Sequence, residues 1–396
     1  MTDQTETVAG RPRLLRSINE QNVLNAIRRA ERLSRRDLTQ LSNLSKPTVG
    51  LVLAGLTADG LVRVAGQRSG ARGPSAALYE IDPDAGYALS LDVGFEYVRG
   101  AIADICGEVR ARATRTVHAA STKSRTADLA ALADSLIAEA GVSASAVLKT
   151  VVGCPGVHQP GGGAGGGHPA GTTDPAWHRP SGGAPAVSIG EVTRVLGPDA
   201  VIENDVNLAA LAERDHGHGR GVDAFAFLTV GTGIGMGVVL DGTIHTGVRG
   251  AAGEIGYLPV RDDGGGVATL ERVASAGGIV RAARRAGMRG AVSAPRVFAA
   301  ARRGDERAVA VIDAGARRIA EALAGVVLAI DPALIVLGGG VGRAEGFADA
   351  VAAHLTEVVP VAPDVRVTAI GEEAVVDGGM AAALDLAWQK LLDQRS

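Results

Sequence analysis

The chain has 396 residues, a formal net charge of −3, 46% hydrophobic residues and 21% charged residues. This composition excludes general disorder, because enough apolar surface is available to offset the entropy lost on folding. No apolar run approaches the roughly 20 residues of a membrane-spanning helix, and the polar first segment lacks a signal-peptide core. We therefore expect a cytoplasmic protein with no membrane partner. Two cysteines exclude a disulfide framework.

Charge is distributed unevenly along the chain. Residues 1–80 contain 12 basic and 7 acidic residues, a net charge of +5, whereas the remainder carries −8. A basic segment joined to an acidic body favours an anionic partner such as DNA. On charge alone, a chance excess of solvated arginine remains an alternative.

The first 60 residues show the pattern of a helix-turn-helix. Apolar spacing predicts a helix over 17–30, and Ser34 with Asp37 resembles a capping box that opens a second helix. A third helix is predicted over 46–59, because Ser45 is a good N-cap and a proline is tolerated in a first helical turn. The third helix would be the recognition helix.

Two predicted strands around a basic glycine-rich loop follow, which is typical of the wing of a winged helix. Such a loop can lie along phosphates or enter a minor groove. The alternative is a small three-helix domain with a hairpin tip that contacts nothing. We predict a DNA-binding domain over 1–82, with double-stranded DNA contacted by Ser45, Lys46, Pro47, Thr48, Gly50, Arg68 and Arg72.

The remaining chain reads as two similar α/β halves, 83–204 and 205–396, and we place a dimerisation surface on the second half. Each half begins with a predicted hairpin and continues with alternating helices and strands. A glycine run over 231–237 lies between two strands, where backbone N–H groups can approach phosphate oxygens. It is not a dinucleotide-binding fingerprint, because no helix follows it. The pattern predicts the two-lobed fold of actin-like ATPases.

Several short motifs together carry a resemblance to one family. In the predicted DNA-binding domain, 1–82, these motifs are Asn19-x-x-x-Val23-Leu24, Ser34-Arg35-Arg36-Asp37-Leu38, Leu44-Ser45-Lys46-Pro47-Thr48-Val49 and Gly60-Leu61-Val62. In the body they are Pro155-Gly156, Glu203-Asn204-Asp205-Val206-Asn207, Gly231-Thr232-Gly233-Ile234-Gly235 and Ala252-Gly253-Glu254-Ile255-Gly256. On these motifs the chain resembles the ROK family, named for repressors, open reading frames and sugar kinases, over almost its whole length.

The resemblance implies a sugar site. Asp205 matches the family's general base, which takes a proton from the sugar hydroxyl as phosphoryl transfer begins. The same position also suits a helix N-terminus, and both roles can coexist. The resemblance further implies sugar contacts from Asn204, Glu254 and Glu271. Two positions depart from the family, since Tyr257 stands for its histidine and Thr173 for its asparagine.

The kinase chemistry departs from the family more strongly. The phosphate loop Asp-x-Gly-Gly-Thr becomes Asp92-Val93-Gly94-Phe95-Glu96, which brings a bulky side chain and an anion toward phosphate. At the family's zinc ligands stand Tyr257, Asp262, Gly264 and Thr269, which cannot replace thiolates and imidazole at tetrahedral geometry. We therefore expect no metal, no cofactor and no catalysis, with Asp205 a vestigial base.

The sequence thus predicts a transcriptional regulator, and specifically a repressor, that forms a homo-oligomer (a dimer or tetramer) and senses a sugar or sugar derivative. Two alternatives remain. One is a residual ATP-dependent sugar kinase resembling glucokinase, which the intact Asp205 favours. The other is a ligand-independent DNA-binding dimer, against which the retained Glu254 and Glu271 argue.

Overall fold

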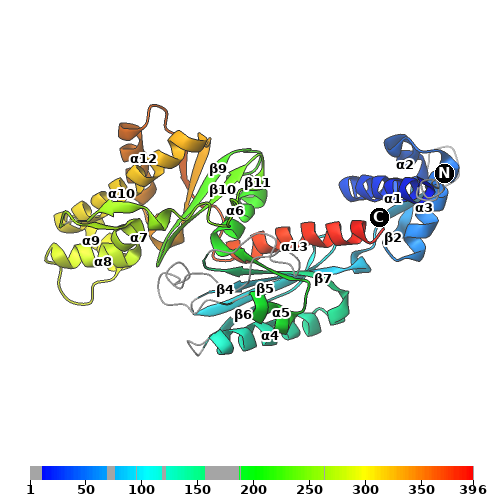
Figure 1. Cartoon of the computed structure of the whole chain (residues 1–396), viewed down its shortest axis with the longest axis horizontal. Helices are drawn as coiled ribbons and strands as arrows, with labels where there is room; N and C mark the ends of the chain where they lie inside the picture. Colours follow the sequence, from blue (N-terminus) through cyan, green and yellow to red (C-terminus); the bar gives the residue numbers. More distant parts are fainter. Residues whose placement is uncertain are drawn as a thin grey trace, which may run out of the picture.

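The structure, a computed structural model, describes residues 11–68, 76–94, 96–117, 122–156, 187, 189–262 and 264–395. Figure 1 shows a small N-terminal unit, here called the head, beside a body of two lobes. Within the described ranges, no helix is both long enough and apolar enough to cross a membrane.

The head is a winged helix-turn-helix. Three helices pack above a small antiparallel sheet with the strand order β1-β3-β2. Ser34 and Asp37 form the predicted capping box, and the Ser45 side chain accepts a hydrogen bond from the backbone N–H of Thr48, as expected for an N-cap. The elements are α1 (Arg11–Ala30), β1 (Leu33–Ser34), α2 (Arg35–Ser42), α3 (Lys46–Ala58), β2 (Val62–Arg68) and β3 (Ala76–Ile81).

The first lobe is built on a five-stranded sheet with the order β6-β5-β4-β7-β8. Its first three strands are antiparallel, and β4, β7 and β8 are parallel, as crossover helices require. The elements are β4 (Tyr87–Val93), β5 (Tyr97–Asp104), β6 (Val109–Thr116), α4 (Thr122–Glu139), β7 (Val147–Cys154), α5 (Ile189–Leu196) and β8 (Ala200–Asn204), with short 3-10 turns at Pro83–Ala85 and Ala144–Ala146.

The second lobe repeats this topology in the order β11-β10-β9-β14-β15. A two-stranded hairpin and several helices are added to it. Its elements are β9 (Phe225–Val230), β10 (Ile234–Leu240), β11 (Thr243–Ile244), the 3-10 turn η3 (Ile255–Tyr257), β12 (Pro259–Arg261), β13 (Val267–Thr269), α7 (Leu270–Ala274), α8 (Ala276–Arg285), α9 (Ala294–Arg302), α10 (Glu306–Ile330), β14 (Leu334–Gly338), α11 (Gly339–Gly342), α12 (Phe347–Val358) and β15 (Asp364–Val367).

Two long helices cross between the lobes, α6 (Asp205–His216) and α13 (Ala374–Asp393). Helix α6 packs on β9 and β10 of the second lobe, whereas α13 packs on β4 and β7 of the first lobe. The two helices touch closely, because a Cβ on Gly378 would lie 1.7 Å from the carbonyl oxygen of Leu208. The last helix of the range 205–396 thus lies on the first-lobe sheet.

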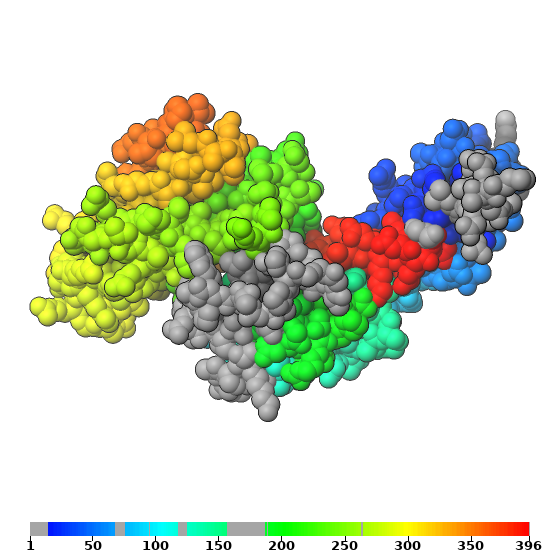
Figure 2. Space-filling view, in the orientation of Figure 1, coloured from blue at the N-terminus to red at the C-terminus, as the bar shows by residue number. Residues whose placement is uncertain are grey.

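Helix α13 also carries the head. In Figure 2 its red C-terminal half lies between the blue head and the green body. Trp388 is 5% exposed within the apolar core of the head, donates a hydrogen bond to the carbonyl of Ile105, and lies under the Arg28 guanidinium. Arg395 adds ion pairs to Glu20 and Asp59. The head is therefore held on the first lobe mainly by α13, and Ile105 and Leu148 of the first lobe pack against the same core.

Candidate functional site

The predicted sugar site begins where β8 ends and α6 begins. Asn204 is the N-cap of α6, since its side-chain oxygen accepts hydrogen bonds from the N–H groups of Val206 (2.8 Å) and Asn207 (3.1 Å). Its amide donates to the carbonyl of Gly156 at 3.0 Å. This cap places Asp205 on the first turn of α6, with its Oδ1 3.0 Å from the N–H of Val206.

The second lobe supplies the other predicted residues. Glu254 is at the start of η3, Tyr257 at its end, and Glu271 on the first turn of α7. Glu271 accepts a hydrogen bond of 3.1 Å from the N–H of Ile234, which follows the glycine turn of β9 and β10. All three residues are half-buried. Thr173 lies outside the described residues.

Burial raises the pKa values of these carboxyl groups. The pKa of Asp205 rises to about 6, although its hydrogen bond with the N–H of Val206 opposes the rise. The pKa of Glu254 rises to about 7 through burial and the nearby charges of Asp205 and Glu271. Burial, Glu254 and Glu271 likewise raise the pKa of Tyr257. Because charges act on one another only over short distances, these effects indicate that Asp205, Glu271 and Tyr257 all lie near Glu254.

Sequence reasoning left Asp92 out of the ligand set, yet it borders the same site. It is 5% exposed, and burial together with Asp205 raises its pKa to about 7. Arg99, its cross-strand partner, opposes this rise from 3.7 Å and also reaches Glu372 at 3.1 Å. The register of β4 and β5 places Arg99 opposite Asp92. The sequence alone does not give this register, so the pair was not predicted. Phe95 lies outside the described residues, and Glu96 is exposed.

The zinc positions of the family do not fit a metal here. Asp262 uses its Oδ1 to accept hydrogen bonds from the N–H groups of Gly264 (3.0 Å) and Gly266 (2.8 Å). Thr269 is engaged as the N-cap of α7, and Gly264 has no side-chain donor atom. In the described part of the chain, no group of three or more His, Cys, Asp or Glu side chains could hold a metal ion. Asp262 closes the turn between β12 and β13 instead.

A buried carboxylate joins the two chain segments that cross between the lobes. Glu213, near the end of α6, is 0% exposed. One of its oxygens accepts from the N–H of His218, at 2.9 Å, and the other from the hydroxyl of Thr368 and the N–H of Ala369. His218 follows α6, and Thr368 precedes α13. The Glu213 side chain therefore links the end of α6 to the segment that leads into α13. Sequence reasoning missed this residue.

The predicted DNA contacts lie at the start of α3. Ser45, Lys46 and Pro47 are exposed, whereas Thr48 and Gly50 are half-buried. A Cβ on Gly50 would meet no atom within 4 Å, so this position faces open space. Arg68 ends β2, but its side chain lies outside what the structure describes, as does the whole of Arg72.

The fold and the site together define a two-lobed actin-like body that carries a winged helix-turn-helix head. The chain belongs to the ROK family, whose model matches residues 88–390. This confirms the resemblance on which the sequence prediction rests.

Known relatives include both regulators and kinases. The chain is 24% identical over 368 residues to the xylose repressor of Caldicellulosiruptor bescii, covering 88% of this chain and 89% of the repressor. It is 34% identical over 203 residues to a glucokinase of Halalkalibacterium halodurans, covering 45% of this chain and 62% of that enzyme. It thus spans less than two thirds of that kinase.

A solved structure supports the fold over 96% of the chain. It is a ROK family transcriptional regulator described as a homologue of the E. coli MLC protein. The match has a TM-score of 0.71 and 22% identity, and it covers 96% of this chain and 98% of that one. The similarity extends through the head as well as both lobes.

Proposed function

We propose that this protein is a DNA-binding transcriptional repressor whose body senses a sugar or sugar derivative. The observation that carries the proposal is the fixed connection of a winged helix to a ROK body through α13. The full-length similarity to the xylose repressor supports it. Exposed Ser45, Lys46 and Pro47 at the start of α3 would face the major groove.

The effector would bind between the lobes. Asn204 and Asp205 approach it from the start of α6, and Glu254 and Glu271 from the second lobe. Carboxylates accept hydrogen bonds from sugar hydroxyls. A ligand held by both lobes stabilises one interlobe arrangement over another, and only such differential affinity shifts the population. In a homo-oligomer, a dimer or a tetramer, this shift would change the spacing of the heads.

A second candidate, a sugar kinase, rests on Asp205. A general base works best when its pKa lies near the working pH, and burial raises the pKa of this carboxyl to about 6. Against it, Arg99 lies at Asp92, and the turn after β4 carries Glu96 in place of a small polar residue. We propose that phosphoryl transfer from ATP is lost.

The test uses the full chain and a duplex selected from a random pool for tight binding. DNA release is followed while a panel of hexoses, pentoses and their amino derivatives is titrated. We expect one sugar class to release the DNA. Asp205→Ala and Glu254→Ala should keep DNA affinity and weaken the sugar response ten- to a hundredfold, because each lost charged hydrogen bond is worth about 1.5–3 kcal/mol.

Other outcomes would select the alternatives. If both variants bind DNA poorly and melt early, these carboxylates are structural and the ligand-independent dimer is supported. If the wild type consumes ATP only when a sugar is present, it is a kinase. Arg366→Ala is the matched control, because this exposed side chain lies outside both the predicted DNA contacts and the predicted sugar site. It should change neither the DNA affinity nor the sugar response.

A further inference from the structure

A short part of the second lobe is strongly basic within an otherwise acidic body. Residues 281–318 contain ten arginines and three acidic residues, a net charge of +7. The other residues from 81 onward carry a net charge of −15. The basic charge of the chain therefore lies in two places, the head and this segment.

The segment spans α8, α9 and the first half of α10, which pack against one another. In Figure 1 these helices form the end of the second lobe farthest from the head. Nine of the ten arginines are exposed and Arg318 is half-buried. We call this surface the arginine face; it comprises Arg281, Arg284, Arg285, Arg289, Arg296, Arg302, Arg303, Arg307, Arg317 and Arg318.

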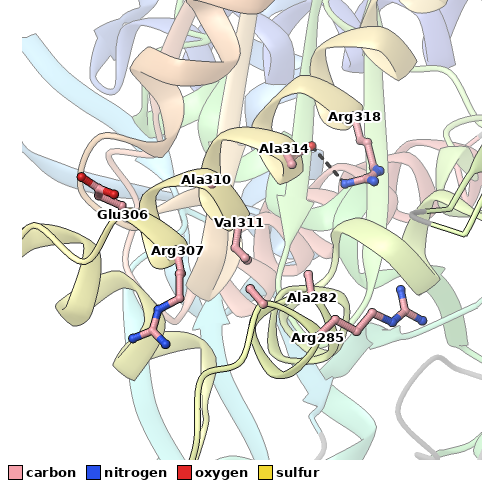
Figure 3. Close-up of a pocket in the computed structure, with 9 residues that line it drawn as sticks. Ala282, Arg285, Glu306, Arg307, Ala310, Val311, Ala314 and Arg318 are labelled. Carbon is pink, nitrogen blue, oxygen red and sulfur yellow. Dashed lines mark hydrogen bonds between the residues drawn. The ribbon is translucent and has the colours of Figure 1, made fainter.

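A groove runs across this face. It has a volume of about 470 Å³ and an alanine- and valine-lined floor between α8 and α10. Figure 3 shows Arg285 and Arg318 extending toward the same side of it and Arg307 toward the other side. Arginines therefore flank the groove on both sides, and Glu306 lies on the side of Arg307.

Few carboxylates neutralise the face. Arg307 pairs with Asp305 at 3.0 Å, and longer contacts join Arg302 to Glu345 (3.8 Å) and Arg317 to Asp313 (4.0 Å). In contrast, Arg284, Arg289 and Arg303 make no ion pair with any described residue. The face thus keeps a positive potential toward solvent.

The chemistry of the face favours a polyanion over a protein partner. Protein interfaces are centred on buried aromatic or large apolar anchors, whereas the one large apolar side chain described as exposed over 281–318 is Val309, at 49%. Symmetric self-association would place two basic faces together, which like-charge repulsion opposes. Exposed guanidinium groups spread over three helices suit the repeated phosphates of a duplex.

We propose that the arginine face is a second DNA-contacting surface, which binds the phosphate backbone without reading its sequence. The proposal rests on the proposed function in one respect, that DNA is the partner of this chain. It does not depend on which operator the head reads. DNA held by the head of one subunit would meet the face through bending or through another subunit of the oligomer.

The test measures the salt dependence of binding to a random 60-base-pair duplex by the full chain. The variant is Arg284→Ala/Arg289→Ala/Arg303→Ala, chosen because these side chains are exposed and make no described ion pair. Each lost phosphate contact lowers the slope of log affinity against log salt by about 0.9. We expect the slope to fall by about 3, so that between 50 and 200 mM salt the wild type loses about 40-fold more affinity than the variant.

The matched control is Arg115→Ala/Arg220→Ala/Arg249→Ala, three exposed body arginines outside the face, which should leave the slope unchanged. A slope that is equal in the wild type and the face variant overturns the proposal. The proposal is also overturned if polyglutamate displaces the duplex from the wild type but not from the face variant. That result would assign the arginine face to an acidic protein partner. Lys46→Ala separates the two claims, because it should weaken binding to the selected operator whether or not the face contacts DNA.

Discussion

The two lobes arrange their strands in the same order, yet the turn between the first two strands of each sheet carries different residues. In the first lobe the turn follows Asp92, whose buried carboxyl lies beside Arg99. In the second lobe the turn is Gly231-Thr232-Gly233, closed by a backbone hydrogen bond of 2.9 Å from the N–H of Gly231 to the carbonyl of Gly233. One topology therefore supports an ion pair in one lobe and an open backbone turn in the other.

This comparison separates the residues that determine the fold of each lobe from those that determine the chemistry of its turn. Both sheets have buried strands, such as β4 and β9, and this pattern is typical of central strands that are covered on both faces. The turns contribute little to either core, so their residues can change without loss of the fold.

The largest effect should come from breaking the contact between the lobes. Gly378→Ala would place a methyl group 1.7 Å from the carbonyl oxygen of Leu208, so the backbones of α6 and α13 must separate. We expect a loss of about 3 kcal/mol or more in the free energy of unfolding, measured by urea titration. Gly325→Ala, a helical site with open space around it, should instead stabilise by about 0.5–1 kcal/mol. Equal stability of both variants would contradict the contact.

A second prediction concerns the first-lobe turn. Because the pKa of Asp92 in the folded protein is about 7, above its unfolded value, this group destabilises the fold increasingly as pH rises from about 4 to 7. Asp92→Asn should therefore raise the free energy of unfolding at pH 8 by about 2–3 kcal/mol and have little effect at pH 4. Denaturant titrations at both pH values measure this. A variant less stable than the wild type at pH 8 would show that the pair with Arg99 outweighs burial.

Asp199 should show the opposite sign. Burial opposes its ionisation, but hydrogen bonds from Lys390 and Lys149 outweigh burial and lower its pKa. Its contribution is present above the unfolded pKa and is lost as pH falls through the lower folded value. Since its side chain is 41% exposed, Asp199→Asn should cost at most about 1 kcal/mol at pH 7. The cost should vanish near pH 2, and a cost that grows with acidification would contradict this sign.

The smallest expected effect is that of metal removal. Asp262 and Thr269 are engaged in hydrogen bonds at the family's zinc positions, so chelation should leave the melting temperature unchanged. Elemental analysis of the untagged protein should find no stoichiometric zinc. A shift in Tm on adding EDTA would reveal ligands outside the described residues.

The sequence predicted most of the elements because local signals set their ends. Ser45 is the N-cap of α3, and this helix spans Lys46–Ala58 where the range 46–59 was expected. Helix α1 (Arg11–Ala30) is longer than its predicted range of 17–30, because its first turns, which include Leu14 and Leu15, are helical as well. Family motifs also predicted one sugar site with Asp205, Glu254 and Glu271, and the charges of Asp205 and Glu271 do act on Glu254.

The contacts that could not be predicted from the sequence depend on which surfaces pack together in three dimensions. Periodicity shows that a helix has an apolar side, but not that Trp388 covers the head. Arg99 finds Asp92 only through strand register, and Glu213 looks like an ordinary surface residue of a helix until the two crossings enclose it. Such partners are set by tertiary packing, which overrides local signals.

The docking of the head on α13 has a consequence for synthesis. On the ribosome, α13 follows the head by about 300 residues, which at roughly 5–20 residues per second takes about 15–60 s. During this interval the apolar side of the head that receives Trp388 has no partner. A chain interrupted before α13 would therefore carry a head that lacks its main contact with the body.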